Sequence, residues 1–189
     1  MTTRTDMSAI ILLLRGMCEA GTADYTLAGA AYWTDDQLQD ALDRSRIDLN
    51  MVQLSATPRY SGGSITYTEY RAPMGYIEGG TALEVVDASG ATQGTATYTA
   101  DAMRGIVNFI SDQAGAARYI NGRAFDLDKA AAEVWRKKAS HYATAYNINA
   151  DGQNLSRAQL FEHAIEMARE YSGMVRGADV SIGRGDDTW

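Results

Sequence analysis

Residues 119–171 constrain the fold most, because they read as two amphipathic helices joined by a polar loop. Asp126 is a suitable N-cap for the first helix, and Asp128 in the first turn complements the helix dipole. Apolar side chains then recur at spacings of three and four residues, which places them on one helix face. These side chains are Leu127, Ala131, Trp135, Ala139, Tyr142 and Tyr146.

Residues 147–154 interrupt this period with turn-forming side chains. Ser156 and Gln159 then have the spacing of a capping box, which predicts the start of a second helix. The apolar stripe of that helix consists of Leu160, Ala164, Met167, Ala168 and Tyr171. Two such helices joined by a short loop are expected to pack as an antiparallel hairpin.

Two further helices are predicted near the N-terminus. The first covers about residues 6–20, and it is so apolar that its own bundle or a neighbouring subunit must cover it. Its apolar face consists of Ile10, Leu13, Leu14 and Met17, widened by Ile11 and Leu12. The second helix opens at Thr34, where Gln37 completes a capping box. Its predicted buried stripe is Leu38, Ala41, Leu42, Ser45, Leu49 and Val52.

The sequence pattern changes from helical to strand-like after residue 58, where alternating β-forming side chains predict a small antiparallel β region. An isolated hairpin is only marginally stable in water, so this region is expected to pack against the helical bundle or against a neighbouring subunit. Three exposed tyrosines are its candidate contact residues: Tyr67, Tyr70 and Tyr98.

Residues 177–189 are spaced by glycines and have no helical period. They are either a disordered terminus or an extended arm that becomes ordered on a partner, with residues 180–182 adding to a sheet edge. The candidate contact residues of such an arm are Val180, Ile182, Arg184 and Trp189.

These elements predict a mainly α fold with a β insertion. An N-terminal helical pair would occupy residues 1–58, and a β-rich insertion residues 59–118. A helical hairpin in residues 119–176 would complete the bundle, and residues 177–189 would form an extended C-terminal arm.

Composition excludes several classes of protein. The chain of 189 residues is 46% apolar, which argues against wholesale disorder, and its net charge of −7 argues against a sequence-independent grip on nucleic acid phosphates. Its single cysteine, Cys18, excludes an intramolecular disulfide and is expected to be a buried apolar residue. The apolar run 9–14 is too short for an export signal or a membrane span, so a soluble protein is expected.

The loop at residues 147–154 half-matches a calcium-binding loop. Asn147, Asn149, Asp151 and Gly152 fall at positions one, three, five and six of the EF-hand spacing. The twelfth position, which requires a bidentate glutamate, is Ala158, so the loop is interpreted as a turn.

The remaining candidates for chemistry also favour structural roles. His141 and His163 lie on different helices of the hairpin and lack metal-site spacing, so packing is expected for both. The acidic run around Asp35 and the basic triplet 136–138 are interpreted as solvated helix faces. No catalytic residue, cofactor or metal is predicted, and the protein is not expected to be an enzyme.

The order of several motifs resembles the head–tail connector (adaptor) proteins of tailed phages. A glycine and an aromatic–Asp pair precede an alanine-rich helix, and a polar loop with glycine and serine leads into the next helix. The residues that carry the resemblance are Gly122, Phe125, Asp126, Ala130–Ala132, Trp135, Gly152 and Ser156–Gln159. Residues 32–44 are similar to the second helix of that family.

This resemblance implies a structural virion protein made in the host cytoplasm and located in the neck between capsid and tail. Such adaptors form a ring, expected to hold about twelve subunits, beneath the portal protein. The ring extends the DNA channel, through which the genome passes without specific binding, and docks a stopper or tail-completion protein. The C-terminal arm would contact the portal, and no membrane is involved.

Two alternatives remain open. The chain could itself be a stopper or tail-completion protein, although those are usually richer in β structure. It could also be a hydrolase or metalloenzyme, which would need a cluster converging from Asp35, Asp126, His141 and His163.

Overall fold

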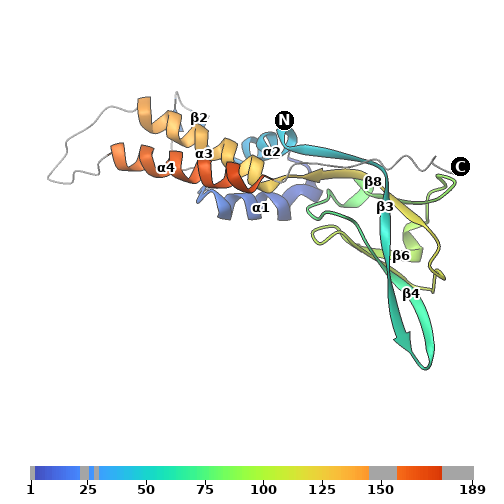
Figure 1. The fold of residues 1–189 in the computed structure, drawn as a ribbon. Coiled ribbons are helices and arrows are strands. Elements are labelled where there is room, and N and C mark those ends of the chain that lie inside the picture. Colours follow the sequence, from blue (N-terminus) through green and yellow to red (C-terminus); the bar gives the residue numbers. More distant parts are fainter. Residues whose placement is uncertain (1–2, 22–25, 28–29, 145–156, 176–189) are drawn as a thin grey trace, which may run out of the picture.

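The computed structural model describes residues 3–21, 26–27, 30–144 and 157–175 (Figure 1). The α-helices of this part are α1 (Ser8–Met17), α2 (Asp35–Arg44), α3 (Leu127–Thr144) and α4 (Arg157–Met174). Its strands are β1 (Thr26–Leu27), β2 (Ala30–Ala31), β3 (Arg46–Ser61), β4 (Ser64–Arg71), β5 (Glu84–Asp87), β6 (Tyr98–Asp101), β7 (Ile106–Phe109) and β8 (Arg118–Phe125). Short 3-10 turns are η1 (Thr5–Met7), η2 (Gly80–Ala82) and η3 (Thr95–Thr97).

A six-stranded antiparallel sheet makes the fold a mixed one, so the prediction of a mainly helical bundle with a β insertion is wrong. The strand order is β5-β8-β3-β4-β7-β6, and β1 pairs with β2 separately. The sheet draws on residues 46–125, a longer part of the chain than the predicted insertion. It curls around its own apolar core, which includes Leu49, Leu54, Tyr70, Val85, Val107 and Ile120.

The strand β3 explains most of this error. The second helix was predicted to continue through Val52, but α2 ends at Arg44 and β3 begins at Arg46. Its first part pairs with β8 from Arg46 to Leu54, and its last part pairs with β4 from Ser55 to Ser61. The register shifts between Leu49 and Val52, as in a β-bulge.

At this bulge Met51 adopts a left-handed conformation with φ of 52°. Its N–H donates a hydrogen bond of 2.8 Å to the side-chain oxygen of Asn121 on β8. A side chain from the neighbouring strand therefore takes the place of the interrupted ladder, and one long strand serves both halves of the sheet.

The helical part agrees better with the sequence. The α3 and α4 helices lie side by side and run in opposite directions, which confirms the predicted hairpin packing (Figure 1). Asp126 caps α3, because its side chain accepts a 2.9 Å hydrogen bond from the N–H of Lys129. The predicted capping box of Thr34 and Gln37 is also present at α2. Ser156, the predicted cap of α4, lies outside the described residues.

The molecule has two separate apolar cores, one in the helices and one in the sheet. The helical core contains Ile10, Leu14, Leu38, Leu42, Phe125, Ala130, Ala131, Val134, Trp135, Ala164 and Ala168, among others. Figure 1 shows the helices at one end, the sheet at the other, and the β3–β4 hairpin projecting away from both. We call the distal part of this hairpin, residues 57–67, the ribbon.

Candidate interaction surfaces

Three of the residues that carry the resemblance to phage adaptors, Gly122, Phe125 and Asp126, form the junction between the sheet and the helices, while Gly152 and Ser156 lie outside the described residues. Gly122 lies in β8, where an added Cβ would sit 3.1 Å from the carbonyl oxygen of Ala82. Phe125 ends β8 and is buried in the helical core, and Asp126 then caps α3. Each residue of this motif therefore has a structural role: close approach, anchoring and helix initiation.

The next part of the motif packs α3 against the N-terminal helices. Ala130, Ala131 and Ala132 are buried, which allows α3 to approach its neighbours closely. Trp135 is also buried, and its indole N–H donates a 3.3 Å hydrogen bond to the carbonyl oxygen of Met17 at the end of α1. The alanine-rich segment is thus a packing surface within the chain.

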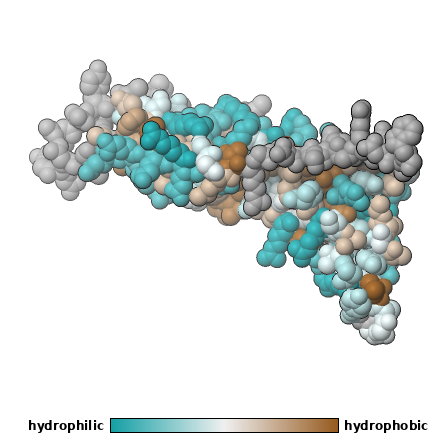
Figure 2. All heavy atoms as spheres, in the orientation of Figure 1, coloured by the Kyte–Doolittle hydropathy of each residue, from teal (hydrophilic) through white to brown (hydrophobic). Residues whose placement is uncertain are grey.

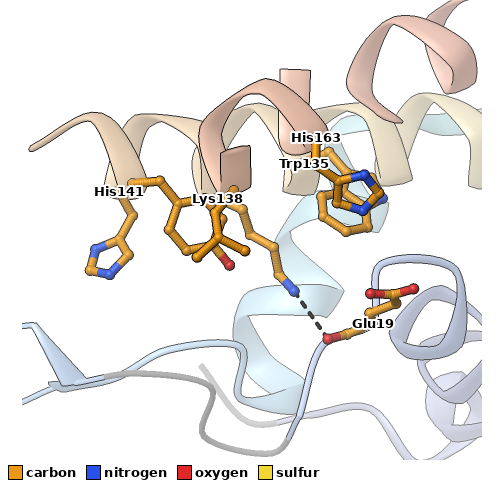
Figure 3. Close-up of a pocket in the computed structure, with 7 residues that line it drawn as sticks. Glu19, Trp135, Lys138, His141 and His163 are labelled. Atoms are coloured by element: carbon orange, nitrogen blue, oxygen red, sulfur yellow. Dashed lines mark hydrogen bonds between the residues drawn. The ribbon is translucent and has the colours of Figure 1, made fainter. Parts of the chain in front are cut away.

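One open hollow of about 310 Å³ lies between α3, α4 and the end of α1 (Figure 3). It is lined by Glu19, Trp135, Lys138, His141, Tyr142, Leu160 and His163. The ring of His163 stands edge-on to Trp135 with 5.6 Å between centroids. Figure 3 shows His141 at the opposite end of the hollow from His163, with Lys138 between them.

Lys138 is the unexpected residue of this hollow, because the basic triplet was predicted to face water and Lys138 is buried. Its ammonium group donates to the carbonyl oxygens of Cys18 (2.8 Å) and Glu19 (3.1 Å), and it lies 5.0 Å from the centroid of the Trp135 ring. Cationic groups favour the carbonyl end of a helix, so Lys138 fastens the end of α1 to α3. The helical period distinguishes Lys138 from Arg136 and Lys137, because Lys138 lies three residues after Trp135 and four before Tyr142 on the apolar stripe.

Cys18 is buried as predicted. Burial raises the pKa of its thiol to about 12, although the charge of Lys138 acts in the opposite direction. A thiol with so high a pKa is almost entirely protonated near neutral pH, so the buried position gives no nucleophile.

The four residues proposed for a catalytic or metal cluster do not meet at one place. His141 and His163 line the hollow, but Asp35 forms an ion pair of 2.6 Å with Arg15, and Asp126 caps α3. Within the described ranges, no group of three or more metal-binding side chains is close enough to hold an ion. The calcium-like loop, with Asn147, Asn149, Asp151, Gly152 and Ala158, falls largely outside these ranges.

Several acids of α2, predicted to form a solvated face, contact neighbouring elements. Asp43 pairs with Arg4 at 2.6 Å, and Arg4 also pairs with Glu78 at 2.9 Å. Glu78 is buried and lies 3.3 Å from the guanidinium of Arg123 on β8. This network ties the N-terminal segment to both the helices and the sheet.

The predicted contact tyrosines lie mostly in the interior of the molecule. Tyr70 is fully buried, and its hydroxyl donates a 3.0 Å hydrogen bond to the carbonyl oxygen of Ala116. Tyr98 is buried against Phe109, and Tyr67 is half-buried beside Gly115. The rings of Tyr70 and Tyr98 are therefore core groups, which a partner could not reach without unfolding the sheet.

Two of the exposed apolar residues of the β region lie instead at the end of the ribbon, while Tyr76 and Ile110 are exposed elsewhere in this region. Tyr60 is 80% exposed and Ile65 is 43% exposed, and they are opposite partners on β3 and β4. They flank a turn at Gly62 and Gly63, both with positive φ. The sequence signal that could have predicted this exposed hairpin end is the pair of apolar residues on either side of a glycine turn.

The candidate residues of the C-terminal arm, Val180, Ile182, Arg184 and Trp189, lie outside the described residues. In the part of the chain that is described, no helix has the length and apolar character needed to cross a membrane.

Comparison of the chain with protein-family models, with curated proteins and with solved structures gave no match.

Proposed function

We propose that this protein is a subunit of the head–tail adaptor ring of a tailed phage. In this role it would sit beneath the portal protein, extend the DNA channel and dock the next component of the neck. The proposal assigns it no catalytic step: its work is to bind other subunits and to hold them in place.

One observation carries the proposal beyond the sequence resemblance. The ribbon projects from the sheet and ends in the exposed pair Tyr60 and Ile65. A two-stranded ribbon is marginal in water, and an aromatic and a β-branched side chain gain little there by facing solvent. Such a projection is typical of a subunit that becomes complete in an assembly.

The junction motif supports the proposal in a second way. Gly122, Phe125, Asp126 and Trp135 each have a defined packing or capping role in this fold. The resemblance therefore rests on residues that would be required to build a similar sheet-to-helix junction, and such a junction is the part that related subunits would share.

A stopper or tail-completion protein is the second candidate function. The observation that favours it is the six-stranded sheet, which is larger than expected for an adaptor. The long α3–α4 hairpin favours the adaptor, because such stoppers are usually richer in β structure. The two candidates differ in the surface that they bind: an adaptor binds the portal, and a stopper binds the adaptor.

A binding experiment with portal rings tests the proposal and separates the two candidates. The full chain is mixed with assembled portal protein of the same phage, and co-sedimentation is compared with that of a chain lacking residues 177–189. An adaptor is expected to bind directly, and the shortened chain is expected to fold normally but to lose binding. Direct binding by the shortened chain would contradict the role of the arm, and binding only after another neck protein is added would favour the stopper.

A further inference from the structure

We propose that the end of the ribbon, formed by Tyr60 and Ile65, docks on the exposed face of α1 in a second copy of this chain. This inference deepens the proposed function, because it names the contact between neighbouring subunits of the ring. It also stands apart from portal binding, since both surfaces belong to this chain and require no other protein.

The ribbon supplies one side of this contact. Among the described residues, residues 59–61 of β3 pair only with residues 64–66 of β4, so no third described strand joins the end of the ribbon. Tyr60 and Ile65 are paired across the two strands and therefore project from the same face. Figure 2 shows a hydrophobic area near the end of this projection.

The face of α1 supplies the other side. Ala9, Leu12, Leu13 and Gly16 recur at spacings of three and four residues, so they share one face of the helix. All four are exposed, with Leu12 at 68% and Leu13 at 43%, and this face carries no charge. An added Cβ at Gly16 would meet no atom within 4 Å, so the helix backbone is open to a partner there.

The exposure of α1 also corrects a prediction from the sequence. Leu13 was expected to share a buried face with Ile10 and Leu14, but those two are buried while Leu13 faces outward. The helix is apolar on both sides, and its own subunit covers only one of them. An exposed uncharged helix face of this kind is typical of a subunit interface.

The ribbon and α1 cannot meet within one molecule, because the ribbon points away from the helices (Figure 1). A contact between two different surfaces of identical chains is heterologous, and repeated contacts of this kind close into a ring when the rotation permits. The ribbon of each copy would therefore cover the α1 face of the next copy. In a closed ring, every subunit would use both its ribbon and its α1 face.

Charge favours the same pairing. Residues 55–71 contain two arginines and one acid and so carry a net charge of +1, with Arg59 and Arg71 both paired to Glu69, in a chain whose net charge is −7. The α1 face has exposed acids at its two ends, Asp6 and Glu19. Arg59 projects from the ribbon face opposite to Tyr60, so we assign these charges to long-range attraction and orientation.

The α4 helix offers the main competing surface, since Leu160 and Phe161 are also partly exposed. Exposed Glu162 and Glu166 lie on the same helix, so this surface is interrupted by charge. The α1 face is the better match for an apolar pair, and α4 provides the control position.

Cross-linking between two variants tests the contact. A chain with Tyr60→Cys is mixed with a chain of different tag length that carries Leu12→Cys, and the mixture is oxidised gently. The buried native Cys18 is left in place. A mixed covalent dimer is expected for this pair and is not expected when Leu12→Cys is replaced by Leu160→Cys. Absence of the mixed dimer, or equal yield with the α4 control, would overturn the inference.

Loss of the apolar pair gives a second readout. The double variant Tyr60→Ser, Ile65→Ser is expected to keep its circular dichroism spectrum and to self-associate at least about tenfold more weakly. Ile110→Ser, at another highly exposed apolar position, is expected to leave self-association unchanged. Unchanged association of the double variant, or a wild-type chain that stays monomeric at every concentration, would contradict the proposed contact.

Different experimental results would reject the proposed contact and the proposed function. Rings that assemble on the portal without the cross-link between Tyr60→Cys and Leu12→Cys would reject this contact and leave the adaptor function standing. A chain that cross-links through this pair but does not bind portal, alone or with other neck proteins, would reject the adaptor function and leave the contact standing.

Discussion

The ammonium group of Lys138, in the middle of α3, donates a hydrogen bond of 2.8 Å to the carbonyl oxygen of Cys18, just beyond the end of α1. Because Lys138 is buried, this bond forms away from water. It joins two helices that are far apart in the sequence and fixes the helix that carries the exposed face described above.

Replacing Lys138 is therefore expected to loosen α1. Lys138→Met keeps the apolar stem but leaves the carbonyl oxygens of Cys18 and Glu19 without this donor, which costs about 1–3 kcal/mol of unfolding free energy. Lys137→Met is the matched control: it removes only a partly exposed ion pair with Glu133, worth less than about 1 kcal/mol. Urea unfolding measures both, and equal losses would contradict the role of Lys138.

The thiol of Cys18 is expected to resist modification in the folded protein. Burial raises its pKa to about 12, whereas the unfolded thiol ionises near its ordinary pKa of about 8.5. Rising pH therefore favours the unfolded state, first above the ordinary value and until the folded thiol also ionises. Labelling with a thiol reagent should be slow in buffer and rapid in denaturant. Rapid labelling without denaturant would show that α1 opens readily.

Acid is expected to weaken the β3–β4 hairpin. Hydrogen bonds from Arg59 and Arg71 hold the pKa of Glu69 below its ordinary value, so the folded state favours the carboxylate. This contribution is present above the ordinary pKa of about 4.3 and is lost as pH falls through the lower folded pKa. A Glu69→Gln variant should be less stable than wild type at neutral pH, and the difference should shrink in acid. A constant difference at all pH values would exclude this linkage.

Gly122 is expected to be required by packing. A methyl group there would lie 3.1 Å from the carbonyl oxygen of Ala82, so η2 or β8 must move to admit it. Gly122→Ala should lower the melting temperature, at a cost of about 1–3 kcal/mol. Gly94→Ala is the control, because its added Cβ meets no atom within 4 Å. Equal melting temperatures for the two variants would contradict the close approach of β8 to η2.

The sequence predicted the elements whose signals are local. The capping box at Thr34 and Gln37, the cap at Asp126 and the apolar stripe of α3 depend on residues within one or two turns. Such signals survive in the fold because the helical core needs those same side chains.

The size of the sheet was underestimated, because the start of β3 and most of the strand β8 lie outside the predicted β region and their signals are not local. Leu49 and Val52 fit the helical spacing of α2, yet Ile47 and Leu49 also alternate with Asp48 and Asn50 as in a strand. The decision between the two periods depends on pairing with β8, which lies far along the chain. Asn121 and Gly122 gave β8 the composition of a turn, although it pairs on both sides.

The candidate surfaces were only partly predictable for a related reason. The sequence marked the first helix as too apolar for full exposure, but it did not say which leucines face outward. It marked tyrosines of the β region as contacts, but burial of Tyr70 and Tyr98 depends on how the sheet curls. Which leucines of α1 are exposed, and which tyrosines are buried, both depend on packing between segments that are distant in the sequence.

The most direct test of the adaptor function is the mass and negative-stain image of the full chain, alone and after mixing with portal rings. The account predicts a closed ring of this protein, or a chain that decorates each portal ring with a fixed number of copies. A monomer that leaves portal rings bare, under conditions in which the portal is intact, would contradict it.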